Sequence, residues 1–391
     1  MENQKTSPNR AGQKLVKKYE KSNSFVSITG TNANLEQIQR LRKVSLSLET
    51  VPKDIQTIVG QACFDALNCD ENEIATFKLY PHVVEEMRRL SDSELPRYLF
   101  YRYRYDIYPI RQKLDKFPPC VQIEPTSICN YRCVFCYQTD PKLTQGRHGH
   151  MGMMDLNTFK TIIDQIYGNV EAVTLASRGE PLMAKEIISM LEYLSGKFIG
   201  LKINTNASFL SEAKAHAILS AEPNTLVFSA DAADEVLYSK LRVNGSLHKV
   251  LSNIERFNKI KEIHYPKNKT ITRVSGVKFS SEQEFNKIDG FWNNYVDQVA
   301  FVSYNPWENA YEAENTQITD HCSDLWRRTF IWWDGLVNPC DVDYRSMLAV
   351  GNIKNQSLSD LWRGPRYQAL RSAHTDGQRC KLNPCKGCVV I

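Results

Sequence analysis

Short apolar runs alternate with segments of helical periodicity through the middle of the chain. The apolar runs predict six strands, at residues 121–126, 172–177, 201–206, 225–231, 272–279 and 298–304. Between them, apolar positions recur at helical spacing and predict helices over 155–167, 184–196, 211–221, 234–241, 247–262 and 282–295. Such alternation is typical of a parallel sheet with right-handed crossovers. Six units are too few for a complete eight-stranded barrel. We therefore expect an α/β fold with a partial (β/α)6 TIM-like barrel and reactive groups at the C-terminal strand ends.

The segments that flank this middle part have different patterns. Residues 1–24 are polar and basic, and we expect them to be disordered. Residues 25–115 carry apolar positions at helical spacing and predict a mostly helical N-terminal region. Within that region, residues 98–114 are dense in Tyr and Arg, so they form either an amphipathic helix packed on the main domain or a binding surface. The barrel is expected to span 116–310, and a smaller cysteine-rich domain 311–391.

Composition and charge narrow the possible functions. The 391 residues contain 49 Lys and Arg against 44 Asp and Glu, and a net charge of +5 is too small to indicate a nucleic-acid partner. The hydrophobic share of 42% and the charged share of 24% are typical of a globular protein. No apolar run is long enough to predict a transmembrane segment, and the polar start lacks the apolar stretch of a secretion signal. We therefore expect a cytoplasmic protein.

Eight of the 11 cysteines fall into two groups. The first is Cys129-x3-Cys133-x2-Cys136, and the second consists of Cys322, Cys340, Cys380, Cys385 and Cys388. An odd number of cysteines in a reducing compartment argues against a disulfide framework. Clustered thiols in such a chain indicate metal or redox chemistry.

Two kinds of metal site fit the first group. Zinc prefers four ligands, and His148 and His150 lie close enough in sequence to complete a zinc site. Thiolates at short spacings also hold iron–sulfur clusters. A [4Fe–4S] cluster with three protein ligands leaves one iron open to a substrate or cofactor. The spacing alone leaves both alternatives open.

Several motifs around the first group resemble those of the radical S-adenosylmethionine (SAM) superfamily over roughly residues 115–310. The three cysteines follow the first predicted strand. The other motifs are the aromatic Phe135, Arg178-Gly179-Glu180-Pro181, Thr205-Asn206-Ala207, Ser229-Ala230-Asp231 and Leu241-Arg242. Two positions depart from the family pattern, because Arg178 and Ala207 stand where glycine is commoner. Both departures are expected to narrow the SAM pocket.

The resemblance implies a mechanism and a set of cofactor contacts. The three cysteines would bind a [4Fe–4S] cluster whose fourth iron is chelated by SAM, and one electron would split SAM into methionine and a 5′-deoxyadenosyl radical. That radical would abstract a substrate hydrogen. A one-electron reductant such as flavodoxin or ferredoxin is the implied partner. The implied SAM contacts are Phe135 at the adenine, Gly179 and Glu180 at the amino group, and Asn206, Ser229 and Arg242 at the ribose and carboxylate.

The second cysteine group is similar to the SPASM or twitch extension of radical SAM enzymes. The pattern Cys322-x12-Gly335-x4-Cys340 carries the resemblance, together with residues 350–362. It implies one auxiliary [4Fe–4S] cluster with the ligands Cys322, Cys340, Cys385 and Cys388. Cys380 is then left over, and it is either inert, a replacement ligand or a hydrogen-atom donor. Cys120 is the second candidate donor.

Further candidate residues lie beside these motifs. Asp341 and Asp343 are candidate bases for a substrate proton, or else they cap the loop of the auxiliary cluster. The residues that follow the sixth strand are candidate substrate contacts, namely Tyr304, Asn305, Trp307 and Glu308.

Three functional hypotheses follow from this resemblance. The leading one is an enzyme that oxidises or epimerises a small polar metabolite such as a sugar, aminosugar or cyclitol. The second is an enzyme that modifies a peptide or protein, for which the N-terminal region lacks a β-rich docking module. The third is a non-enzymatic iron–sulfur or zinc protein that senses redox state or acts as a scaffold, which leaves the SAM-pocket motifs unexplained.

Overall fold

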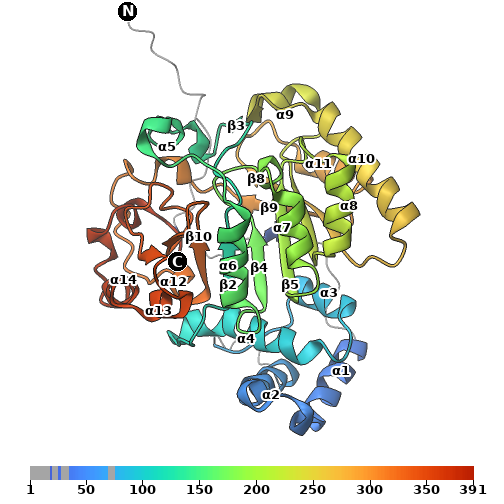
Figure 1. Cartoon of the computed structure of the whole chain (residues 1–391), viewed down its shortest axis with the longest axis vertical. Helices are drawn as coiled ribbons and strands as arrows, with labels where there is room; N and C mark the ends of the chain where they lie inside the picture. The colour runs from blue at the N-terminus through green and yellow to red at the C-terminus, as the bar shows by residue number, and fades with distance from the viewer. Residues whose placement is uncertain (1–17, 20–24, 28–34, 69–74) are drawn as a thin grey trace, which may run out of the picture.

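A parallel sheet forms the centre of the molecule (Figure 1). The computed structural model describes residues 18–19, 25–27, 35–68 and 75–391. The barrel strands are β2 (Cys120–Ile123), β4 (Ala172–Leu175), β5 (Gly200–Thr205), β6 (Thr225–Ser229), β8 (Ile271–Lys278) and β9 (Gln298–Ser303). Neighbouring strands of this set pair in parallel. All six predicted strands are present, so the partial (β/α)6 barrel is confirmed.

Six helices follow the barrel strands and cover the outer face of the sheet. They are α6 (Leu156–Ile166), α7 (Ile187–Leu194), α8 (Glu212–Ala221), α9 (Glu235–Leu241), α10 (Leu247–His264) and α11 (Phe285–Trp292). Side-chain oxygens of Asp155, Ser211, Asp234 and Ser246 accept backbone N–H bonds at the starts of four of them. The apolar faces of these helices pack with the strands into one continuous core.

Among the described residues, four α-helices precede the barrel and have a core of their own. They are α1 (Leu35–Leu46), α2 (Lys53–Leu67), α3 (Pro81–Arg89) and α4 (Leu95–Arg111). Figure 1 shows α4 lying across the edge of the sheet where the strands begin. Arg97 on α4 pairs with Glu171 just before β4, at an Nη2–Oε2 distance of 2.5 Å. The Tyr- and Arg-rich segment therefore packs on the main domain, as one of its two interpretations predicts.

The C-terminal region extends the barrel sheet. Its elements are α12 (Asp324–Arg327), β10 (Arg328–Ile331), β11 (Leu336–Asn338), β12 (Gly351–Asn352), α13 (Leu358–Arg363) and α14 (Pro365–Thr375). Strand β10 pairs in parallel with β2, and β11 and β12 continue the sheet in antiparallel order. On the opposite edge, β1 (Phe25–Ser27) pairs antiparallel with β9. The barrel and the cysteine-rich region thus share one sheet, which the sequence pattern did not predict.

Tyr19 packs against the end of the chain and belongs to the segment 1–24, for which the sequence predicts disorder. Apart from Lys18 and Tyr19, that segment lies outside the described residues. The Tyr19 N–H donates to the Val389 carbonyl at 2.8 Å, and its carbonyl accepts from the Ile391 N–H at 3.1 Å. The Tyr19 side chain is buried in an apolar cluster with Ala310 and Val342. Burial of this ring stabilises the contact of Tyr19 with the C-terminal region.

No helix among the described residues is both long enough and apolar enough to span a bilayer.

Candidate functional site

One cavity of about 490 Å³ runs through the barrel. Its upper end is formed by the loops that follow the strands, and its floor by side chains of α3 and α4. The three cysteines of the first group line its upper end together with most of the predicted SAM contacts. These lining residues are Cys129, Cys133, Cys136, Gly179, Glu180, Asn206, Ser229 and Arg242. The structure therefore brings together residues that lie more than a hundred positions apart in the sequence.

The cysteine loop is fixed by a short strand pair. Strand β3 (Arg132–Cys133) pairs antiparallel with β7 (Arg242–Val243), which places Cys133 opposite Arg242. Arg242 Nη1 lies 3.7 Å from Cys133 Sγ, and the Tyr131 N–H donates to Cys129 Sγ at 3.5 Å. Burial raises the pKa of Cys129 to about 12 and raises the pKa of Cys136 as well. A cationic partner and thiols grouped on one cavity wall fit an iron–sulfur cluster, which takes the deprotonated thiolate form.

The alternative zinc ligands do not take part in this grouping. His148 and His150 do not line the cavity. In the described part of the chain, no three or more His, Cys, Asp or Glu side chains form a group that could hold a metal ion. The three cysteines instead line the main cavity. An iron–sulfur cluster is larger than a single metal ion and needs such a space.

Gly179 is required by a close approach of two loops. A Cβ atom at this position would lie 2.2 Å from the Thr126 carbonyl oxygen and 2.6 Å from that of Ile128. The next residue joins the same two loops, because the Glu180 N–H donates to the Ile128 carbonyl at 2.9 Å. Gly179 thus lets the loop after β4 pack directly on the segment that leads into the cysteines.

Glu180 joins the loops after β4 and β5. Its carboxylate accepts hydrogen bonds from Thr205 Oγ1 at 2.6 Å, from the Asn206 N–H at 2.7 Å and from the Leu182 N–H at 3.1 Å. The carboxylate is buried, and this burial raises its pKa. Glu180 faces the cavity while it also organises the loops that surround the cysteines.

The loop after β5 continues this network. Asn206 Nδ2 donates to Asn130 Oδ1 in the cysteine loop at 3.0 Å. Ala207 has a φ of 60°, in the left-handed region that favours glycine. The alanine at this family glycine position therefore keeps the backbone conformation that a glycine would adopt readily. Ser229 ends β6 and faces the same cavity.

Arg242 and Phe135 lie side by side near the upper end. Arg242 Nε pairs with Asp231 at 2.6 Å, and both side chains are buried. The Phe135 ring lies 5.5 Å from the Phe279 ring and 5.8 Å from the Arg242 guanidinium carbon. Phe135 does not itself line the cavity, so its contact with adenine remains a prediction.

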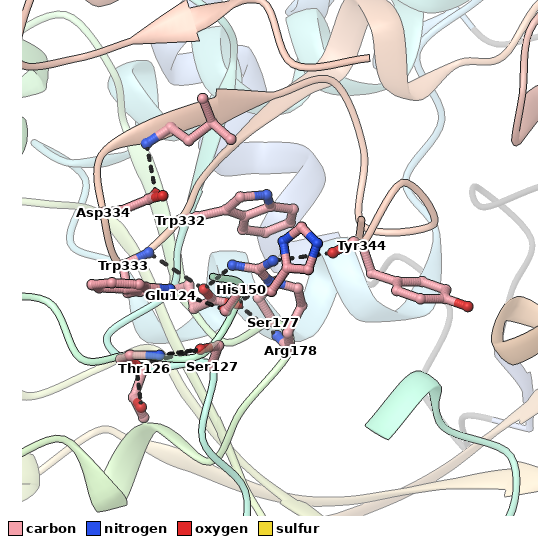
Figure 2. A network of polar contacts seen from close by, with 12 residues as sticks. Glu124, Thr126, Ser127, His150, Ser177, Arg178, Trp332, Trp333, Asp334 and Tyr344 are labelled. Carbon is pink, nitrogen blue, oxygen red and sulfur yellow. Dashed lines mark hydrogen bonds and ion pairs between the residues drawn. The ribbon is translucent and has the colours of Figure 1, made fainter. Parts of the chain in front are cut away.

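Arg178, the second departure from the family pattern, connects the barrel to the C-terminal region (Figure 2). It forms a buried two-pronged pair with Glu124, at 2.7 Å from Nε and 2.6 Å from Nη2. Its Nη1 donates to the Tyr344 carbonyl at 3.0 Å, and its guanidinium lies 4.3 Å from the Trp332 ring centroid. Glu124 was missed by the sequence analysis, although it is a charged residue within an apolar predicted strand, a pattern that could have identified it.

Four cysteines of the second group line a small separate cavity of about 20 Å³. They are Cys322, Cys340, Cys385 and Cys388. Burial is the main cause that raises the pKa of Cys340, and the charges of Cys385 and Cys322 raise it further. Four thiols that line one small cavity fit the thiolate ligand set of an iron–sulfur cluster. Cys380 lines neither cavity.

Arg379 organises the last cysteine loop and was missed by the sequence analysis. Its Nη2 donates to the Cys388 carbonyl and its Nη1 to the Val390 carbonyl, both at 2.9 Å. The Cys322 N–H donates to His374 Nδ1 at 3.1 Å. A fully buried arginine that binds backbone carbonyls has no local sequence signature.

The two candidate bases have different surroundings. Asp341 is buried and lines the main cavity, whereas its sequence neighbour Cys340 lines the small one. Asp343 accepts hydrogen bonds from Tyr311 Oη at 2.6 Å and from the Leu348 N–H at 2.7 Å. Burial raises the Asp343 pKa to about 6. The geometry of Asp343 favours the alternative in which it caps the cluster loop.

Of the four predicted substrate contacts, one lines the main cavity. That residue is Trp307, whereas Tyr304, Asn305 and Glu308 line neither cavity. The Tyr304 hydroxyl donates to the Glu308 carboxylate, and the Tyr304 ring packs edge-on against Phe279. These contacts hold the loop after β9 in place.

Comparisons with known proteins agree with this site. The family model of the radical SAM superfamily matches residues 123–289, and that of the SPASM iron–sulfur cluster-binding domain matches 322–389. A GTP 3′,8-cyclase of Listeria welshimeri is 20% identical over 65% of this chain and 71% of its own length. An S-adenosyl-L-methionine-dependent 2-deoxy-scyllo-inosamine dehydrogenase of Niallia circulans is 22% identical over 70% of this chain and 94% of its own length.

A solved structure adds a match of fold. Streptococcus suis SuiB bound to precursor peptide SuiA has a TM-score of 0.51 and 14% identity, over 90% of this chain and 92% of its own. At this identity the match shows the fold alone. The two domain matches, the barrel and the two cysteine sets lead to one conclusion. The chain belongs to the radical SAM superfamily, as an enzyme with a C-terminal SPASM domain whose cofactors are S-adenosyl-L-methionine and two [4Fe–4S] clusters.

Proposed function

We propose that this enzyme dehydrogenates a small polar metabolite, such as a sugar, aminosugar or cyclitol, at a carbon that bears a hydroxyl group. One observation carries the proposal. Asp341 faces the cavity that also contains the three-cysteine loop, while the adjacent Cys340 faces the second thiol site. A proton acceptor and the auxiliary site thus meet at the cavity where the substrate would react.

The residues divide into two cofactor sites in this proposal. Cys129, Cys133 and Cys136 would hold the first cluster, and Cys322, Cys340, Cys385 and Cys388 the auxiliary one. Gly179, Glu180, Asn206, Ser229 and Arg242 would surround S-adenosyl-L-methionine, with Phe135 beside its adenine. The three cysteines of the first group and all of these S-adenosyl-L-methionine contacts except Phe135 line the main cavity, which supports this division.

The chemistry needs both sites. When bound, the first cluster and S-adenosyl-L-methionine supply a radical that removes a substrate hydrogen atom, and the auxiliary cluster supplies an acceptor for one electron. Asp341 accepts the hydroxyl proton. Removal of one hydrogen atom, one proton and one electron converts the CH–OH group into a carbonyl. Trp307, which lines the same cavity, would shield the reacting carbon from water.

Two observations favour dehydrogenation over epimerisation. Epimerisation needs a hydrogen donor on the opposite face of the substrate, and the predicted donor Cys380 lines neither cavity. The relative from Niallia circulans, by its name, is a dehydrogenase of 2-deoxy-scyllo-inosamine. Cys120 does line the main cavity, so it is the thiol to test if an epimerised product is found.

The proposal also includes a partner and a compartment. A one-electron reductant such as flavodoxin or ferredoxin would reduce the first cluster. We place the reaction in the cytoplasm, because free thiols persist in a reducing compartment.

A substrate screen with the anaerobically reconstituted full chain tests the proposal. Sugars, aminosugars and cyclitols are supplied with S-adenosyl-L-methionine and reductant, and 5′-deoxyadenosine and carbonyl product are quantified. In deuterated water, dehydrogenation leaves the carbon free of deuterium, whereas epimerisation through a thiol incorporates it. Turnover of peptides with no turnover of any small metabolite would instead support the peptide-modifying alternative and contradict the proposal.

A matched pair of variants tests Asp341. Asp341→Asn should still form 5′-deoxyadenosine at a rate within twofold of wild type, while carbonyl product falls by about 100-fold or more. The control Asp376→Asn changes an exposed aspartate of the same domain and should leave both rates unchanged. Normal product formation by Asp341→Asn would rule out its role as the base.

A further inference from the structure

The floor of the main cavity contains a lysine whose ammonium group forms no ion pair with the described residues. Lys202 lies on β5 and lines the cavity far below the cysteine loop. Its ammonium group makes no hydrogen bond or ion pair with any residue that the structure describes.

Two arginines share the space around Lys202. Arg273 reaches the cavity from β8, and Arg328 from the first residue of β10. Burial and the charges of these two guanidinium groups lower the pKa of Lys202 to about 8. Three cationic residues from three different strands therefore line the same cavity inside the barrel.

The acidic groups of the floor have partners of their own. Asp106 of α4 pairs with Arg102 at 2.9 Å, and Arg328 pairs at 3.2 Å with Asp324, which lines the small cavity. Glu86 of α3 accepts a hydrogen bond from the Tyr98 hydroxyl at 2.5 Å. The charge of Glu86 raises the pKa of Lys202, but the two groups form no ion pair, and Glu86 also acts on Arg102 and Arg273. A half-buried ammonium group beside guanidinium groups is stabilised when an anion joins it.

The polar lining of the floor suits an oxyanion. Hydroxyl groups of Thr174 and Thr225 line the same space as the Lys202 ammonium and the Arg273 guanidinium. Ammonium, guanidinium and hydroxyl donors together are the groups that bind phosphate or carboxylate oxygens. We name this part of the cavity the lower chamber, and define it by Arg102, Thr174, Lys202, Thr225, Arg273 and Arg328.

We propose that the lower chamber binds an oxyanion, a phosphate or a carboxylate, carried by the substrate. This inference rests on the proposed function, because it names the class of metabolite that the same cavity would accept. Along β5, residues 202, 204 and 206 share one face of the strand, and Lys202 and Asn206 lie about 13 Å apart along it. A substrate held by its anionic end in the lower chamber would extend towards the cysteine loop. It would present its reacting carbon at the opposite end.

Calorimetry on the reconstituted full chain tests the proposal without any turnover. Inorganic phosphate and succinate are titrated separately, so that phosphate and carboxylate preferences are distinguished. At least one should bind saturably, and Lys202→Met should weaken that binding at least tenfold. Lys202→Arg keeps the charge and should retain binding within about threefold. Lys185→Met, which changes an exposed lysine of the barrel surface, should have no effect.

Several results would overturn the proposal. In the first, the wild-type protein binds neither phosphate nor succinate saturably. In the second, the anion affinity of Lys202→Met stays within twofold of the wild-type affinity. If Lys202→Met does not fold, reductive methylation of wild-type Lys202 by formaldehyde is measured by peptide mass spectrometry. Phosphate or succinate should protect Lys202, and equal labelling with and without both anions would also overturn it.

The same samples separate this proposal from the proposed function. Formation of 5′-deoxyadenosine is measured in parallel with S-adenosyl-L-methionine and dithionite. Anion binding without that product would leave the lower chamber in place and contradict the proposed reaction. Formation of 5′-deoxyadenosine without anion binding would contradict the lower chamber as an anion site and leave the proposed reaction in place.

Discussion

The two cysteine sites are assembled in opposite ways. The first uses three cysteines of one eight-residue loop, 129–136, which opens onto a cavity of about 490 Å³. The second has four cysteines spread from Cys322 to Cys388, which line a separate cavity of about 20 Å³. Three thiols beside a large cavity leave room for a cofactor to complete the cluster. In the proposed division, the four thiols at the small cavity complete the second cluster with protein alone.

The supporting contacts differ in the same way. Loops that follow successive barrel strands hold the first site, through Gly179, Glu180 and Asn206. At the second site, Arg379 binds the carbonyls of the last cysteine loop and His374 accepts the N–H of Cys322. The barrel loops thus place three thiols beside a large cavity, whereas the C-terminal domain packs tightly around its four thiols.

The largest expected effect follows from a substitution in the open site, the loop of the three cysteines. Cys133→Ala should abolish 5′-deoxyadenosine formation and lower iron from about eight to about four atoms per chain. The C-terminal site should keep its iron, because its four thiols lie in a separate cavity. Iron analysis and product chromatography after anaerobic reconstitution measure both. Undiminished formation of 5′-deoxyadenosine would show that this loop does not hold the reactive cluster.

A substitution in the closed site should give the complementary result. Cys388→Ala should also leave about four irons per chain, but slow 5′-deoxyadenosine formation should continue while substrate oxidation is lost. Cys380→Ala is the matched control, because Cys380 lines neither cavity, and it should keep about eight irons. An unchanged iron content in Cys388→Ala would contradict the proposed set of four ligands.

The buried pair of Arg178 and Glu124 lies where the barrel meets the C-terminal region, and it should contribute strongly to the free energy of unfolding. Arg178→Met strands the Glu124 carboxylate and should lower the free energy of unfolding by about 3–5 kcal/mol. The double variant with Glu124→Met should recover at least half of that loss. Lys240→Met breaks an exposed pair with Glu282 and should cost about 1 kcal/mol or less. Chemical denaturation measures all three variants, and equal losses for Arg178→Met and Lys240→Met would contradict the account of Arg178.

The smallest loss of stability in this series should follow from adding a single methyl group at Gly179. Gly179→Ala places a Cβ 2.2 Å from the Thr126 carbonyl and should cost about 1–3 kcal/mol, with slower S-adenosyl-L-methionine cleavage. Gly290→Ala is the control, because a Cβ there meets nothing within 4 Å and the residue lies in α11. That change should stabilise the protein by roughly 0.5–1 kcal/mol. Equal stability of the two variants would show that the loops tolerate the methyl group.

Much of the barrel could be predicted because its signals are local. The apolar run that predicts residues 201–206 as a strand corresponds to β5, Gly200–Thr205. Motif residues at consecutive strand ends also converge, because parallel strands end at one edge of the sheet. Arg242, which the resemblance places at S-adenosyl-L-methionine, pairs with Cys133 of the cysteine loop.

The remaining features depend on contacts between distant segments. No local pattern shows that β10 pairs with β2, about 200 residues earlier, or that α4 forms the floor of the cavity. Glu124, Lys202 and Arg379 acquire their environments only through such packing. The candidate substrate contacts after β9 follow from their place in the sequence alone, and of these four only Trp307 lines the main cavity.

The central claim is that one chain contains an open and a closed iron–sulfur site. Its most direct test is anaerobic reconstitution of the wild-type full chain with iron and sulfide, followed by iron analysis and a 5′-deoxyadenosine assay with dithionite and S-adenosyl-L-methionine. The account predicts about eight irons per chain and slow formation of 5′-deoxyadenosine without substrate. Bound zinc with no 5′-deoxyadenosine would contradict the claim for both sites, and about four irons with 5′-deoxyadenosine would contradict it for the closed one.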